Sequence, residues 1–366
     1  MSEAARTEKM EDRQGRGKGL ERIELLGLGL VALSLGLLVF NPGAIAGLFN
    51  AMVDRAFPII VKVFLTGTVG VALICSVMMG RILERCGFTD ALMRIFVPLT
   101  RLIGVNPAVI IPSVYNILGD INAAGRIAGP ILVKAGATKD EQKIAIATMV
   151  QSQQSFSTFM FGLIALTAVG VRAYVIVILA VFAPLVVVPF LLRHSLWRDT
   201  KAVALSDLPR FTPTKAALPT LFGAAREGAE LLFLLIIPAV GVTYALIGAL
   251  DYVGIWQPIE SGMSALLNAL AIDPATGMVS ILASPTLAMA QLKDVAATLD
   301  PRFVVGSFVL GASGFPLSVL FGQIPAIWSE ATDLNEKEAL GAAILGAVMR
   351  LATAGAVALF LTPLLL

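Results

Sequence analysis

Tyr115-Asn116-Ile117-Leu118-Gly119-Asp120-Ile121-Asn122-Ala123-Ala124-Gly125-Arg126 is the stretch that decides the fold, because it places polar groups inside apolar sequence. Within this stretch, an amide, a carboxylate, a second amide and a guanidinium interrupt the apolar helical pattern. Polar groups and broken backbone are costly in a membrane unless they line a cavity or are buried in protein. A second polar stretch, Gln151–Thr158, interrupts the next apolar segment. The two stretches together predict a polar site inside a membrane protein.

The composition supports a membrane location. Of the 366 residues, 57% are hydrophobic and 14% are charged, whereas a soluble domain carries about 25% charged residues. We therefore expect an all-α polytopic protein with the lipid bilayer as its surroundings. The basic residues lie in loops and form no basic face with interleaved aromatic residues, so no nucleic-acid partner is expected.

The residues that carry most enzyme chemistry are scarce. Cys75 and Cys86 fit no ligand spacing, and His194 is the single histidine, so we expect neither a metal site nor histidine-based catalysis. The nucleotide-binding, serine-nucleophile and zinc-protease motifs do not occur. The protein is therefore expected to have no cofactor and not to be an enzyme.

Two apolar pieces flank the opening stretch, Pro107–Tyr115 and Ala123–Val133, and each is short. A helix needs about 20 residues to cross a bilayer, so pieces of about ten residues predict a re-entrant hairpin. A second hairpin is expected over 274–298, with its break at Ser284-Pro285-Thr286. Two spanning segments are also expected to be broken. Ile144–Val169 is interrupted at Gln151–Thr158, which we call the polar island, and Phe303–Trp328 is interrupted at 311–316.

The second half of the chain repeats the order of the first. The matching pairs are Asn106-Pro107 with Asp273-Pro274, Thr138-x-Asp140 with Thr298-x-Asp300, and Phe161-Gly162 with Phe321-Gly322. The last two pairs have the same offset, which places Gln151–Thr158 on Gly311–Ser318. We interpret the chain as two repeats, each with about three spanning helices and a re-entrant helical hairpin, and one extra N-terminal transmembrane helix.

Charge and hydropathy divide the chain into five segments. We expect a cytoplasmic tail over 1–22, the N-terminal transmembrane helix over 23–41, a first Gate-like repeat over 57–192, a cytoplasmic linker over 193–228, and a second Gate-like repeat over 229–366. Within the first repeat, a span is expected from Phe57 to Met79, and the second repeat opens with one at Glu230–Leu250.

Lys and Arg set the expected orientation. They concentrate in the tail, in 81–101, in 134–143 and in 193–226, so these segments and the N-terminus are expected in the cytoplasm. An odd number of crossings in each repeat makes the repeats inverted, which is a common plan of secondary transporters. The expected location is a bacterial inner (plasma) membrane.

Both hairpin turns and both helix breaks should meet near the membrane midplane, where free backbone groups and polar side chains can hold a solute. The lining would suit a small polar solute that is uncharged or zwitterionic. The candidate substrate-binding residues are Asn116, Asp120, Asn122, Gln151, Gln153, Gln154, Ser155, Ser284, Thr286 and Ser313.

Three charged residues are candidates for coupling transport to Na⁺ or H⁺: Asp120, Arg126 and Arg350. Each has an alternative role. Asp120 would cap the half-helix that begins near Asn122, Arg126 would face the cytoplasm instead of pairing with Asp120, and the helix of Arg350 would be displaced toward an interface. The polar island would alternatively bond helices together without binding a solute.

The opening stretch resembles the nucleoside-recognition, or Gate, domain family of membrane proteins. This family includes YjiH/YjiG-type proteins, spore maturation proteins A and B, and the gate segments of ferrous-iron and concentrative nucleoside transporters. The matching residues are Leu118-Gly119-x-x-Asn122-Ala123-Ala124, Pro130, Lys134-Ala135-Gly136 and the island Gln151–Thr158. The island is Asn/Ser-rich in proteins similar to spore maturation protein A, whereas it reads Gln-Ser-Gln-Gln-Ser here. The resemblance implies a membrane Gate fold and solute translocation.

Two functions follow from these observations. The first is a secondary transporter, or permease, that moves a small polar, nucleoside-like solute by alternating access at a midplane site. The second is a non-transport scaffold or assembly partner of the Gate family, in which the polar islands only bind helices together. Gly43-x-x-x-Gly47 is a short packing motif, and a homo-oligomer is left open.

Overall fold

The computed structural model describes residues 22–119, 121–202, 210–212, 216–313 and 316–366, and within these ranges it does not describe the side chain of Asn122. The prediction for Asp120 therefore concerns a residue outside the described ranges. The described chain is helical, as expected, with five helices that are long and apolar enough to cross a membrane, or six if a bent pair counts as one span. This is an integral membrane protein built from two inverted repeats.

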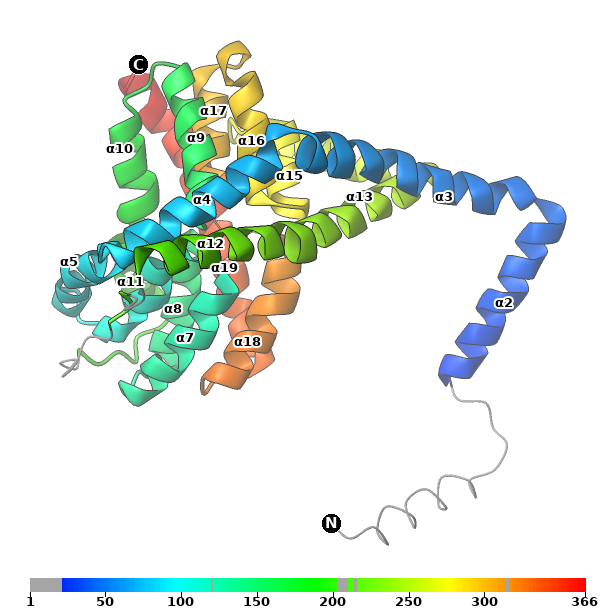
Figure 1. Ribbon diagram of the computed structural model, residues 1–366. Helices are drawn as coiled ribbons and strands as arrows, with labels where there is room; N and C mark the ends of the chain where they lie inside the picture. Colours follow the sequence, from blue (N-terminus) through cyan, green and yellow to red (C-terminus); the bar gives the residue numbers. More distant parts are fainter. Residues whose placement is uncertain (1–21, 120, 203–209, 213–215, 314–315) are drawn as a thin grey trace, which may run out of the picture.

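The N-terminal helix α2 (Arg22–Phe40) stands apart from the rest of the protein. It ends before Asn41-Pro42, as expected from the helix-breaking residues, and α3 (Pro42–Phe57) follows at once. Neither helix buries a residue completely. Figure 1 shows α2 projecting from the far end of α3, away from the helical body.

Two long helical segments cross the front of the body in Figure 1. One consists of α3, the π-helical η1 (Pro58–Leu65) and, after a break at 66–67, α4 (Thr68–Arg85). The other is continuous over 36 residues and consists of α12 (Ala217–Glu230), η4 (Leu231–Ile236) and α13 (Ile237–Tyr252). Helix α13 packs against α3, and α12 packs against α4.

These segments are longer than the sequence indicated. The predicted span Phe57–Met79 is instead the junction of two helices, and the second segment begins at Ala217, inside the stretch expected to be linker. The helix ends carry polar and charged residues such as Arg55 and Glu227. A search for apolar spans leaves such charged ends out of the predicted helix. In the structure they remain helical because they pack along the partner segment.

The two long segments approach closely at Gly248. A Cβ atom on Gly248 would lie 2.3 Å from the backbone oxygen of Ala51 on α3, so only glycine allows this crossing. We expect Gly248→Leu to lower the free energy of unfolding by about 1–3 kcal/mol, because overpacking must push the helices apart. Unfolding of the purified protein in detergent measures this. Gly262→Leu is the control, because a Cβ atom there meets nothing within 4 Å; equal losses in both variants would contradict the prediction.

The first hairpin follows the amphipathic helix α5 (Phe88–Leu102). Its first arm is η2 (Pro107–Ile110) with α6 (Ile111–Leu118), and its second arm is α7 (Ile121–Lys134), which packs against α6. Asn106 caps the first arm by accepting a hydrogen bond from the Ala108 N–H at 3.0 Å. Both arms are too short to span a bilayer, as the sequence indicated.

The second hairpin has the same form. Helix α14 (Trp256–Ala269) bends by 114° into α15 (Pro274–Leu282), and α16 (Pro285–Val295) returns alongside α15, followed by η5 (Ala296–Thr298). Asp273 caps α15 through the Thr276 N–H at 2.8 Å. Asn106 and Asp273, which the repeat paired, are therefore both N-caps of the first arm of a hairpin.

Each hairpin is followed by a broken helix and a further span. In the first repeat these are α8 (Lys139–Gln151) with α9 (Phe156–Ala168), and then α10 (Ala173–Val177), η3 (Ile178–Phe182) and α11 (Pro184–Ser195). The second repeat contains the corresponding elements: α17 (Pro301–Gly311), η6 (Val319–Gln323), α18 (Ile324–Ala331), α19 (Glu336–Ala356), η7 (Val357–Leu361) and η8 (Thr362–Leu364).

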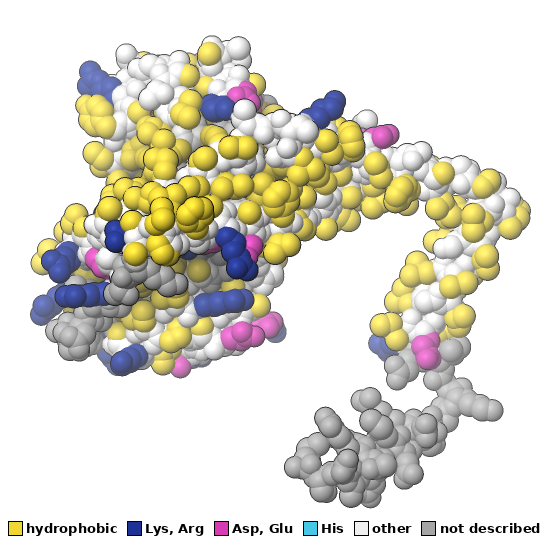
Figure 2. All heavy atoms as spheres, in the orientation of Figure 1, with side chains coloured by type: hydrophobic (Ala, Val, Ile, Leu, Met, Phe, Trp, Pro, Cys, Tyr) yellow, Lys and Arg dark blue, Asp and Glu magenta, His cyan; other side chains and the backbone are white. Residues whose placement is uncertain are grey.

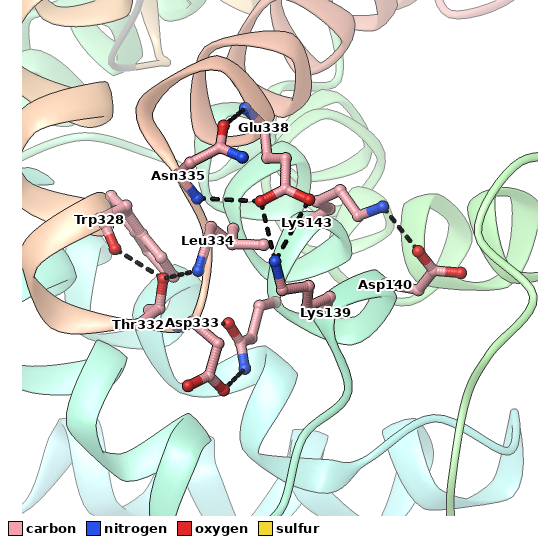
Figure 3. Close-up of polar contacts among 10 residues, drawn as sticks. Lys139, Asp140, Lys143, Trp328, Thr332, Asp333, Leu334, Asn335 and Glu338 are labelled. Atoms are coloured by element: carbon pink, nitrogen blue, oxygen red, sulfur yellow. Dashed lines mark hydrogen bonds and ion pairs between the residues drawn. The ribbon is translucent and has the colours of Figure 1, made fainter.

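The two repeats interlock through polar contacts at one end of α8 and α19, which pack side by side. Figure 3 shows Lys139 of α8 directed at Glu338 of α19, with an Nζ–Oε2 distance of 3.2 Å. Nearby, the Gln142 amide donates to the Asp333 carboxylate at 2.8 Å. Asn335 and Glu338 form a capping box at the start of α19. These contacts join the repeats at the helix ends, away from the polar breaks.

The surface in Figure 2 agrees with a membrane location. Hydrophobic side chains cover the long segments α4, α12 and α13, and Lys and Arg gather mainly toward the side of α5 and α7.

Part of the linker between the repeats is fastened to α5 by Asp90. Its carboxylate accepts hydrogen bonds from the Phe211 N–H at 2.8 Å, from the Thr212 N–H at 3.2 Å and from the Thr212 hydroxyl. Burial opposes the charged form, but these hydrogen bonds outweigh it and hold the pKa of Asp90 below its ordinary value of 3.8.

This attachment makes stability depend on pH. The folded pKa lies below the unfolded one, so Asp90 stabilises the protein above pH 3.8 and loses that contribution as pH falls through the folded pKa. We expect Asp90→Asn to cost about 1–2 kcal/mol at pH 7 and progressively less in acid. Unfolding curves at several pH values test this, with the exposed Asp251→Asn as control. A cost that stays constant down to acid pH would refute the role of the charge.

Candidate functional site

The breaks in the two spans lie against each other. Helix α8 ends at Gln151 and α9 begins at Phe156, while α17 ends at Gly311. Between these ends the backbone is extended, and Gln153 and Ser313 form an antiparallel bridge. The Gln154 N–H donates to the Ala312 carbonyl at 2.8 Å. The equivalent breaks of the two repeats therefore provide hydrogen-bond partners for some of each other's backbone groups, which the helix ends leave unpaired.

The end of the first hairpin's first arm also joins this junction. Asn116 is fully buried, and its amide donates to the Ser152 hydroxyl at 3.1 Å. Its backbone carbonyl accepts from the Ser155 N–H at 3.3 Å. Ser155 has φ +56°, a conformation that costs a non-glycine residue about 1–3 kcal/mol and is concentrated at functional sites.

A cavity of about 120 Å³ opens at this junction. Both hairpin turns, both breaks and both long segments contribute to its lining. The lining residues are Leu73, Val77, Gly119, Ile121, Gln154, Ser155, Ser157, Leu231, Leu235, Ile236, Ala239, Ala283, Ser284, Pro285, Thr286, Pro316, Ser318, Val319 and Gln323. We call this space the central cavity.

The central cavity has one polar side and one apolar side. The polar side comes from the hairpin turns and the breaks, and the apolar side comes from α4, η4 and α13. Among the described lining residues none has a titratable side chain. Such a surface can bind a neutral polar solute through amides and hydroxyls, whereas it offers no counter-charge to an ion.

Hydroxyl groups connect the first break to the second hairpin. The Ser155 hydroxyl lies 3.0 Å from that of Ser157 and 2.9 Å from that of Thr158. The Thr158 hydroxyl lies 2.9 Å from that of Thr286, near the start of α16. Ser284 caps α16 at the hairpin turn, accepting from the Leu287 N–H. The hydroxyls at the cavity are thereby held in place by one another.

The structure separates the predicted site residues into two groups. Gln154, Ser155, Ser284 and Thr286 line the central cavity. Asn116, Gln151, Gln153 and Ser313 lie behind the lining, with at most 1% of each residue exposed. The Gln151 amide donates to the Gly346 carbonyl at 2.7 Å, and the Gln153 amide to the Gln154 carbonyl at 2.9 Å. Of these two side chains, Gln151 bonds across the repeats, whereas Gln153 bonds within its own break.

Four amide oxygens around the first break have no hydrogen-bond donor among the described residues. They belong to Asn116, Gln151, Gln153 and Gln154. A buried amide oxygen without a donor is costly, so these four oxygens remain able to accept a hydrogen bond or to contact a cation. The described residues contain no group of three or more His, Cys, Asp or Glu side chains that could hold a metal ion.

Arg350 lies behind the same break and is fully buried. Its Nη1 donates to the Gln151 carbonyl at 2.9 Å and to the Ala180 carbonyl at 2.7 Å. Gln151 is the last residue of α8, so the cation sits at the negative end of a helix dipole. Backbone carbonyls of two other segments therefore contact this cation inside the protein. Arg126, by contrast, is exposed on α7.

The apolar wall of the central cavity was missed by the sequence analysis. Its residues are Leu73, Val77, Leu231, Leu235, Ile236 and Ala239. Apolar residues in membrane helices carry no local signal that distinguishes a cavity wall from a lipid-facing surface. The repeat was the available clue, because Gly70-Val71 and Gly241-Val242 have the same sequence and lie on the two segments that form the wall.

Comparison with known proteins yields a likeness in structure but not in sequence. No family model matches the chain, and no curated protein sequence matches it. The fold is similar to that of CNTnw, a concentrative nucleoside transporter, in an inward-facing substrate-bound state. The TM-score is 0.62, with 12% sequence identity, and the match covers 92% of this chain and 86% of that chain.

Two further CNTnw structures are similar. A variant in an intermediate state gives a TM-score of 0.59 at 14% identity over 92% of this chain and 86% of that chain. A variant in an outward-facing state gives 0.58 at 13% identity over 92% and 85%. At such identities the likeness establishes the fold alone, a polytopic helical fold shared with the CNTnw structures.

Proposed function

We propose that this protein is a secondary transporter of a small neutral, nucleoside-like polar solute, with the central cavity as its binding site. One observation carries the proposal: both hairpin turns and both helix breaks meet at one cavity between the repeats. Inverted repeats that present broken helices to a shared cavity are a common transporter plan. The similar CNTnw structures are of a transporter in inward- and outward-facing states.

The two sides of the cavity suit alternating access. The apolar wall from α4, η4 and α13 offers the solute no hydrogen bonds, while Gln154, Ser157 and Thr286 on the other side do. A solute held by the hairpins and breaks can therefore move along the wall without breaking polar contacts to it. In this mechanism, the long segments are the fixed element, and the hairpins and broken helices carry the solute.

Na⁺ is the coupling ion that fits the described residues best. Broken helix ends commonly coordinate Na⁺ through free carbonyl and side-chain oxygens, and the amide oxygens of Asn116, Gln151 and Gln153 lack donors near the end of α8. Coupling to H⁺ would instead need a titratable group at the cavity. Asp120 would be that group, and it lies outside the described residues.

The first test is thermal stability of the purified protein against nucleosides, nucleobases, amino acids and carboxylates, with NaCl exchanged for KCl. A ligand of the folded state raises its stability. We expect a shift with nucleosides that is larger in Na⁺, followed by Na⁺-dependent uptake into proteoliposomes. Uptake that proceeds equally in K⁺ would remove the Na⁺ proposal, and a shift with only charged ligands would remove the neutral-solute proposal.

Thr286 provides a matched pair of variants for this site. Thr286→Val removes a hydroxyl that lines the central cavity, so we expect solute affinity to fall about 5- to 10-fold, the equivalent of one hydrogen bond. Thr353→Val is the control, because the Thr353 hydroxyl bonds the Met349 carbonyl of its own helix. Isothermal titration measures both. Equal affinities in the two variants would place the solute elsewhere.

The alternative function is a non-transport scaffold or assembly partner. It is favoured by the bonds that the polar islands make across the repeats, such as Gln151 to Gly346 and Thr158 to Thr286. Under that function Thr286→Val would lower stability or complex formation and change no solute response. The thermal-shift experiment therefore separates the two functions.

The remaining expectations belong to the same proposal. We place the protein in the Gate family and in a bacterial inner membrane, with its N-terminus in the cytoplasm, without enzymatic activity and without a nucleic-acid partner. Cysteine labelling from each side of the membrane, at residues added in the tail and in the 254–255 turn, tests the orientation. Labelling of the tail from outside intact cells would contradict the proposed orientation.

A further inference from the structure

A second cavity, of about 250 Å³, lies beside the second hairpin. We call it the outer cavity. Its walls come from α3, α13, α14, α15 and α16. The lining residues are Arg55, Thr243, Tyr244, Ile247, Trp256, Glu260, Ala275, Met278, Val279, Leu282, Ala283 and Gln291.

The outer cavity adjoins the central cavity. Ala283, in the turn of the second hairpin, lines both. On α13, Ala239 lines the central cavity and Thr243 lines the outer one. These two residues are about 6 Å apart along the helix axis. The Thr243 hydroxyl donates to the Leu282 carbonyl at 3.2 Å, across the boundary between α13 and the hairpin. The two cavities therefore follow each other along one face of α13.

The described lining of the outer cavity contains charged and aromatic side chains, which the described lining of the central cavity lacks. It contains two aromatic side chains, Tyr244 and Trp256, and two opposite charges, Arg55 and Glu260. Trp256 is 5% exposed, and its indole N–H has no hydrogen-bond partner within the described ranges. Neither Arg55 nor Glu260 forms an ion pair with any described residue.

These groups define a chemical class of ligand. The guanidinium and the indole N–H donate hydrogen bonds, the carboxylate accepts them, and the Gln291 amide does both. The opposite charges balance, so the complementary ligand is neutral with donor and acceptor edges. A tyrosine ring adds a face for stacking. A planar nitrogen heterocycle, as in a nucleobase or nucleoside, meets all of these requirements.

Beside the first hairpin, described side chains at the corresponding position contact one another. There the Tyr115 ring packs against Phe211 of the linker, with 5.5 Å between ring centroids. Arg81 bridges Glu84 and Glu227, and Glu227 lies on α12, which is the repeat counterpart of α3. The charged groups that are unpaired beside the second hairpin therefore have paired counterparts beside the first.

We propose that the outer cavity is a second binding site, at which a solute carrying a planar nitrogen heterocycle is held before it reaches the central cavity. The inference rests on the proposed transport function only for the order in which the solute reaches the outer and then the central cavity. Binding at the outer cavity is a property of its own residues, so it can be tested separately from transport.

Tryptophan fluorescence provides the test, because the chain has 3 tryptophans and only Trp256 lines the outer cavity. The protein with Trp197→Phe and Trp328→Phe keeps Trp256 as the single reporter. Uridine and adenosine are titrated into it, with ribose and alanine as ligands that lack a heterocycle. We expect a saturable change in Trp256 emission with the two nucleosides only.

Further variants assign the signal to the outer cavity. Gln291→Ala and, separately, Tyr244→Leu should each raise the apparent Kd by at least about 5-fold, whereas Gln257→Ala on the exposed face of α14 should not. Ala239→Phe, which fills the central cavity, should leave the Trp256 response unchanged within about twofold. Thermal unfolding verifies that each variant is folded, and Glu260→Gln replaces any variant that is not.

Four outcomes would overturn the inference: no saturable response, an equal response to ribose or alanine, a response unchanged by the outer-cavity variants, or a response lost in Ala239→Phe. The two proposals fail differently. A Trp256 response without uptake into proteoliposomes removes transport but leaves the outer site, whereas uptake without a Trp256 response removes only the outer site.

Discussion

Replacing Arg350 by alanine is expected to lower the free energy of unfolding by about 3–5 kcal/mol, the largest loss that a single substitution in this protein should produce. The variant leaves the Gln151 and Ala180 carbonyls buried without these donors. It also opens a space where a fully buried side chain stood. Each unsatisfied carbonyl costs about 1–3 kcal/mol, and the empty space adds to that.

The effect should extend to solute binding. The Gln151 carbonyl is at the end of α8, and Ser152 to Ser155 continue from it to the central cavity. Without the cation the break loses its anchor to α19 and to η3, so the backbone around Ser155 is free to leave its strained conformation. We therefore expect weaker binding in Arg350→Ala even at a temperature at which the variant is folded.

Unfolding in detergent, followed by tryptophan emission, measures the stability loss. Arg350→Lys should lie between the wild type and the alanine variant, because the shorter lysine keeps the charge but does not extend to the position from which Nη1 contacts both carbonyls. Arg302→Ala is the control. Its partner Asp300 is exposed, and such surface pairs contribute little to stability. A loss in Arg350→Ala no larger than that in Arg302→Ala would show that the buried cation is not an anchor.

The sequence was sufficient for the element order because segment length is a strong constraint in a membrane. Pieces of about ten apolar residues cannot cross a bilayer, so hairpins were expected around Gly119 and Ser284, and hairpins are present there. The offset between Phe161-Gly162 and Phe321-Gly322 aligned the two breaks, and Gln153 and Ser313 are indeed bridged. The full lengths of the two long segments were not recognised, because the charged residues near their helix ends do not fit a hydropathy window.

The site was harder to predict than the fold. The sequence identified the polar islands but not which of their side chains face the cavity. At a break, that direction depends on backbone angles such as those of Ser155, and no periodicity applies there. Gln153 and Gln154 are neighbours, yet Gln154 lines the cavity and Gln153 turns back to bond Gln154 and Ser155. The expectations for Asp120 and the Asn122 side chain concern positions that the structure does not describe.

Filling the central cavity should abolish transport while the fold is retained. Ala239 lies on the apolar wall and makes no side-chain hydrogen bond, so Ala239→Phe adds volume to the cavity and removes no polar contact. The cavity measures about 120 Å³, so a phenyl group excludes the solute. We expect solute affinity to fall at least about 100-fold, or about 2.7 kcal/mol, with no detectable uptake into proteoliposomes.

Val242→Phe is the matched control for Ala239→Phe. It adds the same ring to the same helix at a position that is 63% exposed and does not line the central cavity, so it should bind and transport as the wild type does. The pair also separates transport from a scaffold function. A scaffold needs the polar bonds between the repeats, which Ala239→Phe leaves intact, so its partner binding should survive. Uptake that persists in Ala239→Phe would place the solute path outside the central cavity, whereas uptake lost equally in both variants would mean that a bulky group anywhere on α13 disturbs the protein.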